Sequence, residues 1–152
     1  MSAARGAPTD EPLRIRRILP APPNDVYSAW TDPERLRDWL SPVGHAEAEV
    51  DLRAGGSFRI VMIGEGHRIE HTGEYLELTP PERLVFTWSS PYTGPEPSVV
   101  TVELRPHDAG TELLLTHERL PQGAADSHGR GWGALLERLT ALLAAEAKGP
   151  AR

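Results

Sequence analysis

The chain has 152 residues, no cysteine and a formal net charge of -6, with acidic and basic residues mixed along its length. Such a length fits one domain, and the lack of cysteine excludes disulfides, Cys-ligated zinc and thiolate chemistry. No basic stripe is present for nucleic acid, and no segment approaches the roughly 18 apolar residues of a membrane helix or contains a signal-peptide core. We therefore expect a soluble, cytoplasmic protein that neither binds nucleic acid nor inserts into a membrane.

The first part of the chain predicts a strand, two short helices and a second strand. Leu13 to Leu19 reads as a strand and ends at a proline-rich stretch that cannot continue a sheet ladder. Asn24 to Trp30 and a segment through Leu36 to Leu40 read as short helices, each opened by proline. Ala46 to Arg53 alternates apolar and charged residues, which predicts a strand with one face in water.

The middle of the chain predicts a meander of short strands. Apolar alternation places them around Phe58 to Met62, His67 to Thr79, Arg83 to Ser89, Val99 to Arg105 and Thr111 to Glu118. Turns rich in Gly and Pro separate these segments. Connections this short join antiparallel neighbours, so the sequence predicts one antiparallel sheet.

The last element is a long amphipathic helix, predicted from Gly131 to about Glu146. Apolar residues recur there at helical spacing, namely Trp132, Leu135, Leu136, Leu139, Leu142 and Leu143. We predict an α+β domain of the helix-grip type over residues 13–144, in which a curved seven-strand sheet wraps this helix and leaves room for a cavity. The Ala/Gly/Pro-rich ends, 1–12 and 145–152, are expected to be flexible tails.

Several segments together resemble a known family. They include Val26-Tyr-Ser-Ala-Trp-Thr-Asp-Pro, Asp51-Leu-Arg-Ala-Gly-Gly-Ser-Phe, the run from Gly73 to Trp88, and Gly131-Trp132 before the leucine stripe. In order and spacing they resemble the activator of heat-shock-protein-90 ATPase homologue family, within the START/Bet v-like (SRPBCC) superfamily, from about Leu13 to Ala144. The resemblance implies the helix-grip fold and a hydrophobic ligand cavity. The founding eukaryotic activators have two domains, so direct chaperone activation is not expected of this chain.

Alternation along the strands and the helix stripe select the side chains expected to face the cavity. They are Arg17, Trp39, Phe58, Met62, Tyr75, Trp88, Leu115, His117, Trp132 and Leu136. His117 follows leucines on the inward face of its strand and is either a ligand contact or a hydrogen-bonded core residue. Arg17 either anchors a carboxylate or extends to solvent. The tryptophans are core, or line the cavity where helices rim its mouth.

Other polar patterns give no catalytic or metal site. His67 and His71 are four apart on a strand, which separates them by about 13 Å, too far to share a metal ion. The paired carboxylates lie on the wet strand faces, where nothing would separate their pKa values. We expect no metal, no cofactor and no catalytic residue. The residues eligible to supply an acid–base pair in the cavity are Arg17, His71, Tyr75 and His117.

The sequence therefore predicts a protein that binds a small hydrophobic molecule, such as a lipid or a polyketide-like aromatic. Two alternatives stay open, a cyclase or hydrolase that uses the same cavity and a stress- or chaperone-linked partner protein. The sequence leaves open the identity of the ligand and the choice between transport, sequestration and sensing. It also leaves open the oligomeric state, and a homodimer is possible.

Overall fold

The computed structural model describes residues 9–42, 44–64 and 66–147, and its elements follow the predicted order. They are β1 (Leu13–Leu19), α1 (Pro23–Thr31), α2 (Pro33–Trp39), β2 (His45–Val50), β3 (Ser57–Gly64), β4 (His67–Thr79), β5 (Arg83–Trp88), β6 (Ser98–His107), β7 (Gly110–Glu118) and α3 (Ala125–Ala147). No helix among the described residues is long and apolar enough to cross a membrane.

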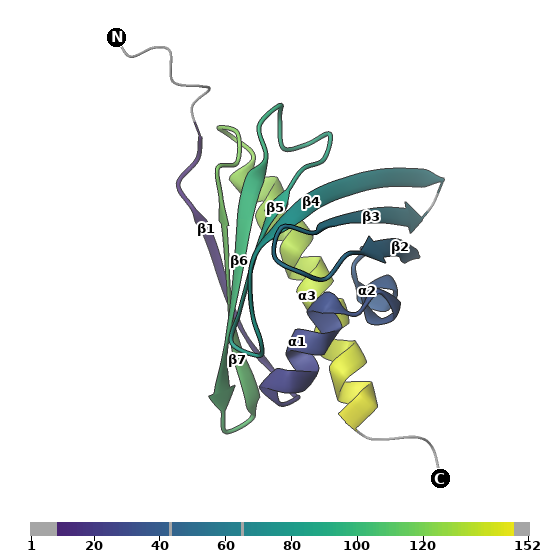
Figure 1. Ribbon diagram of the computed structural model, residues 1–152, viewed down its shortest axis with the longest axis vertical. Coiled ribbons are helices and arrows are strands. Elements are labelled where there is room, and N and C mark those ends of the chain that lie inside the picture. The colour runs from purple at the N-terminus through teal and green to yellow at the C-terminus, as the bar shows by residue number, and fades with distance from the viewer. Residues whose placement is uncertain (1–8, 43, 65, 148–152) are drawn as a thin grey trace.

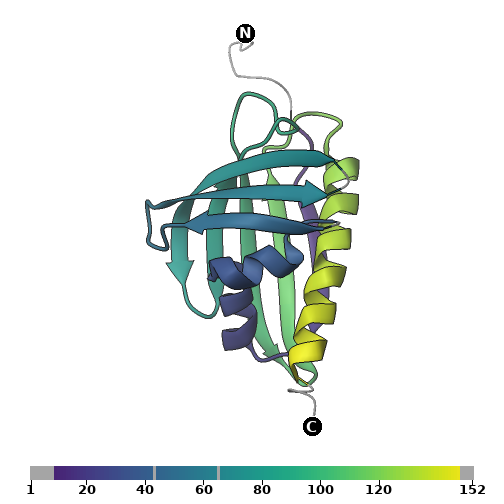
Figure 2. The same cartoon turned by 90° about the vertical axis from the view of Figure 1, so that its right-hand side faces the viewer.

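The strands form one 7-stranded sheet in the order β1-β7-β6-β5-β4-β3-β2, with every neighbouring pair antiparallel. The sheet curves around α3, which lies along its inner side (Figure 1). Turned by 90°, the strands β2, β3 and β4 cross in front of the other strands, and α1 and α2 lie below them beside α3 (Figure 2). The predicted helix-grip fold is confirmed.

The sheet changes direction at Gly73 on β4. This strand pairs with β3 as far as Glu74 and with β5 from Tyr75 onward, where the register shifts. A Cβ atom on Gly73 would lie 2.0 Å from the carbonyl oxygen of Thr87 and 2.3 Å from Cζ of Phe58. Only glycine lets the two halves of the sheet approach this closely, so residue 73 helps to fix the curvature that encloses α3.

A cluster of aromatic rings packs among the aliphatic side chains on the inner side of the sheet. Trp30 and Trp39 pack edge to face with centroids 4.8 Å apart, and Trp88 lies 5.5 Å from Trp132 on α3. Phe86 joins the same cluster and is buried, as are the four tryptophans. Because rings of this size occupy the space between sheet and helix, the centre of the fold is a packed core.

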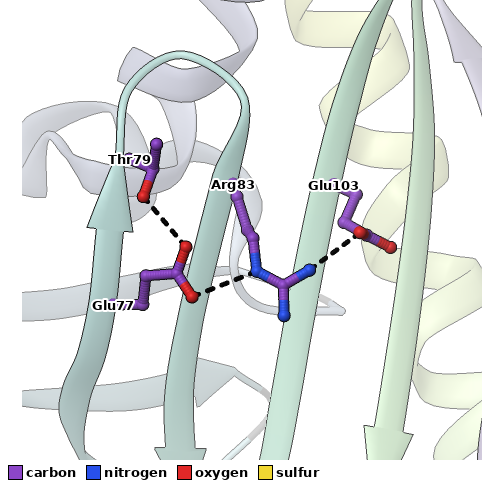
Figure 3. Close-up of polar contacts among 4 residues, drawn as sticks. All are labelled: Glu77, Thr79, Arg83 and Glu103. Carbon is purple, nitrogen blue, oxygen red and sulfur yellow. Dashed lines mark hydrogen bonds and ion pairs between the residues drawn. The ribbon is translucent and has the colours of Figure 1, made fainter.

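The face of the sheet away from α3 is polar. Arg83 bridges Glu77 at 3.1 Å and Glu103 at 2.8 Å, and the Thr79 hydroxyl donates to Glu77 (Figure 3). The Thr79 hydroxyl, followed by Arg83, lowers the pKa of Glu77. Since these side chains are all solvent-accessible, their ion pairs add little net stability.

Two element boundaries differ from the sequence prediction by more than two residues. β2 ends at Val50 instead of Arg53, because the amide of Asp51 bonds to Ser57 and the chain then turns. The last helix begins at Ala125, six residues before the predicted start at Gly131. Its first turns are polar and contain glycine, so the apolar stripe from which the helix was predicted does not extend into them.

The structure describes only the inner parts of the two predicted tails, because residues 1–8 and 148–152 lie outside the described residues. Thr9 forms a bridge with Pro121, and the Asp10 carboxylate accepts hydrogen bonds from the amides of Gly123 and Ala125 at 2.8–3.0 Å. Asp10 therefore caps the start of α3 from outside the helix. At the other end the helix continues to Ala147.

Candidate functional site

A cavity of about 330 Å³ lies between the first half of α3 and the inner faces of β3, β4 and β5. Its apolar lining consists of Pro42, Met62, Ile69, Trp88, Trp132 and Leu135. The rest of the lining is His71, Ser90, Tyr92, Ser127, His128 and Gly131. Pro42, Tyr92 and Gly131 are exposed whereas His71, Trp88 and Trp132 are buried, so the cavity runs from the surface into the interior.

Ordinary periodicity brings these residues together. Ile69 and His71 are two apart on β4 and therefore share its inward face. His128, Trp132 and Leu135 follow one another at spacings of four and three residues, which places them on one stripe of α3. The segment after β5 forms part of the mouth, where the Tyr92 side chain is 61% exposed.

His71 is the buried polar side chain on the sheet wall of the cavity. It is 7% exposed, and its ring stacks on Trp88 with centroids 4.6 Å apart. Burial lowers the pKa of His71 to about 4; the backbone carbonyl of Ile69 partly offsets this shift, and nearby His128 adds to it. The ring is therefore neutral at physiological pH, and its buried Nδ1 has no hydrogen-bond partner.

His128 lies on the helix wall and is half-buried. Its Nδ1 is 3.0 Å from the carbonyl oxygen of Ala124. Since a carbonyl only accepts, Nδ1 carries a proton, and in the neutral ring Nε2 is left as an acceptor. The two cavity histidines thus come from different elements, one on β4 and one on α3.

His117 takes part in a hydrogen-bond chain behind the cavity wall. The indole Nε1 of Trp132 donates to Nδ1 of His117 at 3.0 Å, which leaves the ring proton on Nε2. Nε2 donates to the Ser98 hydroxyl at 2.8 Å, and that hydroxyl donates to the Trp88 carbonyl at 2.6 Å. Burial, assisted by His128, lowers the pKa of His117 to about 3. The chain of bonds holds the two tryptophans that line the cavity.

Comparison with known proteins identifies the family of this fold. A profile of the family described as "Activator of Hsp90 ATPase homolog 1-like protein" matches residues 20–144. The chain belongs to this family. None of the curated proteins compared with the chain matches it.

Similar solved structures cover nearly the whole chain. Protein CV1439 from Chromobacterium violaceum is 31% identical with a TM-score of 0.75, covering 88% of this chain and 98% of that one. Protein NE0264 from Nitrosomonas europaea is 30% identical with a TM-score of 0.76, covering 89% and 95%. CalU16 from Micromonospora echinospora is 31% identical with a TM-score of 0.65, covering 90% and 77%. These similarities agree with the helix-grip architecture.

The structure separates the predicted pocket residues into groups. Met62, Trp88 and Trp132 line the main cavity. Phe58 and Tyr75, together with the same two tryptophans, surround an inner void of only about 20 Å³, which is about the size of one water molecule. Contact of any of these side chains with a ligand stays a prediction.

The remaining predicted residues line neither space. Trp39, the last residue of α2, packs against Trp30 on α1, and its indole donates to the Ala29 carbonyl at 2.9 Å. Arg17 is half-buried and donates to the Arg16 carbonyl at 2.9 Å. Leu115, His117 and Leu136 are fully buried. Large aromatic neighbours fill the space that strand alternation alone would assign to a cavity.

His128 and Ser127 are the lining residues that the sequence prediction missed most clearly. Both lie in the part of α3 that was assigned to a loop. Extending the helical spacing back four residues from Trp132 would have reached His128. Among the described residues, no group of three His, Asp or Glu side chains could hold a metal ion.

Proposed function

We propose that this domain binds a small hydrophobic molecule in the cavity between α3 and the sheet. The main support for this proposal is the lining of the cavity. Tryptophan, methionine, isoleucine and leucine side chains surround a space of about 330 Å³ that reaches the surface. This volume lies at the lower end of the range of small-molecule sites, roughly 300–1,000 Å³. An apolar pocket with a few polar groups is the usual form of such a site.

The first test looks for the ligand itself. Native mass spectrometry of the purified protein should show a bound small molecule. A screen of fatty acids, flavonoids and polyketides should raise the melting temperature, because a ligand that binds only the folded state stabilises it by mass action. At a hundredfold excess over Kd the shift should be roughly 5–10 °C. No bound molecule together with no shift across the screen would contradict the proposal.

A cavity-filling substitution locates the binding site. Gly131 lines the cavity, and a Cβ atom on it would meet no other heavy atom within 4 Å, so this position has room for a side chain. Gly131→Leu should reduce ligand-induced stabilisation strongly. Gly131→Ala, which adds one methyl group, and Gly133→Ala, which lies outside the lining, should retain most of it.

The same variants control for changes in folding. Replacing a helix-interior glycine by alanine should stabilise the unliganded protein by about 0.5–1 kcal/mol. If Gly131→Leu keeps the melting temperature of the parent protein without ligand, a loss of ligand-induced stabilisation in this variant cannot be due to unfolding. If ligands stabilise Gly131→Leu as much as the parent protein, they bind elsewhere.

A cyclase or hydrolase activity in the same cavity is the second candidate, supported by the two histidines that face it. Burial keeps the pKa of His71 at about 4, which makes it a weak general base at neutral pH. Binding is therefore favoured over catalysis. Time-resolved hydrolysis of nitrophenyl esters tests this alternative. An enzyme of this kind should turn the esters over, and the turnover should disappear when either His71 or His128 is replaced.

A further inference from the structure

Nδ1 of His71, a side chain that lines the cavity, is a buried polar atom without a hydrogen-bond partner. His71 as a whole is 7% exposed. Buried polar atoms in folded proteins nearly always have a partner, and leaving one unsatisfied is costly. His117, the other deeply buried histidine of the fold, uses both of its ring nitrogens. Tyr27 Oη and Trp30 Nε1 are also buried without a partner but do not line this cavity, so His71 is the candidate here for a hydrogen bond with a bound ligand.

Three other polar groups of the lining already have partners on the backbone. Nδ1 of His128 and the Ser127 hydroxyl both bond to the Ala124 carbonyl. The Ser90 hydroxyl accepts from the Tyr92 amide. The buried atom that lacks a partner in this lining is therefore on His71.

The charge of the lining restricts what that outside partner can be. None of the described residues that line the cavity is Asp, Glu, Lys or Arg. His71 itself is neutral at physiological pH because of its burial. An ionised ligand group placed beside it would lose its hydration without gaining an opposite charge, which is strongly unfavourable. A hydroxyl group loses much less, and it can donate to and accept from a neutral imidazole.

The ring faces around His71 suit an apolar body attached to that hydroxyl. His71 stacks on Trp88, and Trp88 lies 5.5 Å from Trp132 on the opposite element. Both indoles line the cavity together with Leu135 and Met62. A ligand that reaches His71 from the mouth therefore passes between aromatic and aliphatic side chains.

We propose that the ligand of this cavity is an uncharged molecule with an apolar body and a hydroxyl group, and that the hydroxyl hydrogen-bonds to the imidazole of His71. This inference rests on the proposed binding function and adds the chemical class of the ligand. It also states a selectivity, because the site accepts a phenol or alcohol and rejects the corresponding carboxylate.

A matched series of probes tests the inference. We would measure the affinities of 4-propylphenol, propylbenzene and 4-propylbenzoate by isothermal titration calorimetry near neutral pH. The phenol should bind about threefold to tenfold more tightly than the hydrocarbon, which is the effect of one neutral hydrogen bond. The benzoate should bind at least about tenfold more weakly than the phenol, since its charge is buried without a partner.

Substitutions connect this selectivity to His71. His71→Phe keeps an aromatic ring against Trp88 and removes both nitrogens, so the phenol should lose its advantage over the hydrocarbon while the hydrocarbon still binds. His128→Phe is the matched control on the helix wall and should keep the advantage. His71→Gln retains a donor and an acceptor and should restore part of it, which also covers the case in which His71→Phe does not fold.

The outcomes distinguish this inference from the function on which it rests. If all the probes bind the parent protein equally, or if the benzoate binds most tightly, the cavity binds ligands but the hydroxyl inference is wrong. An advantage of the phenol that persists in His71→Phe, or disappears only in His128→Phe, also overturns it. If no probe binds and the wider screen is negative as well, the binding function fails together with the inference.

Discussion

We predict that the free energy of unfolding of this domain falls at acidic pH because His117 is buried and hydrogen-bonded. Burial and the neighbouring His128 hold the pKa of His117 at about 3, against an ordinary value of 6.5. Because the folded value is the lower one, the contribution is fully present above about pH 6.5 and is lost as the pH falls toward 3. Between pH 7 and 5 the unfolded chain protonates this ring and the folded protein does not. That difference removes about 2 kcal/mol from the free energy of unfolding.

The assay is urea unfolding near pH 7 and near pH 5, for the parent protein and for His117→Gln. A glutamine amide can still accept from Trp132 and donate to Ser98, but it does not titrate. The variant should therefore lose about 2 kcal/mol less than the parent over this pH interval. Carboxylates and His71 titrate in both proteins, so their contributions cancel in the comparison.

A control separates the buried ring from histidines in general. His67 is exposed at the start of β4, and His67→Gln should leave the loss between pH 7 and pH 5 unchanged. An equal loss in the parent and in His117→Gln would refute the reasoning, since it would mean that His117 binds protons as readily in the folded protein as in the unfolded chain.

Two further predictions concern the frame around the cavity. Gly73→Ala should destabilise the protein by more than about 2 kcal/mol in urea unfolding, because its Cβ would overlap the Thr87 carbonyl and the Phe58 ring; unchanged stability would show that residue 73 does not set the bend of the sheet. Asp10→Ala should lower the melting temperature by a few degrees through loss of the α3 cap at Ala125, with a smaller effect for Asp10→Asn, which keeps an acceptor. Equal melting temperatures for all three proteins would show that the carboxylate does not stabilise the helix.

The fold could be predicted from the sequence because its signals are local and repeated. Alternating apolar residues located every strand, and the boundaries of β1 and β4 match those predicted. The leucine stripe located the helix that the sheet encloses. Where the signal was weak, as in the polar first turns of α3, the boundary was missed. The stabilising contact there comes from Asp10, more than a hundred residues earlier in the chain.

The candidate site was only partly predictable, because a cavity is the space that side chains leave unfilled. Strand alternation correctly places Phe58, Leu115 and His117 inside, but inside is mostly packed core. Met62, Trp88 and Trp132 belong to the lining of the main cavity, and the same alternation identified them. The pattern along a strand records which face a residue points to and contains no information about what lies opposite.

The sequence by itself determined the class of fold, the order of the elements and the apolar character of the interior, since these follow from backbone periodicity and residue type. The tertiary structure decided which inward side chains remain beside open space. It gave both ring nitrogens of His117 hydrogen-bond partners in Trp132 and Ser98, and it left Nδ1 of His71 without a partner. Both histidines are buried on strands of the sheet, and they differ because hydrogen bonding depends on neighbours brought together from different elements.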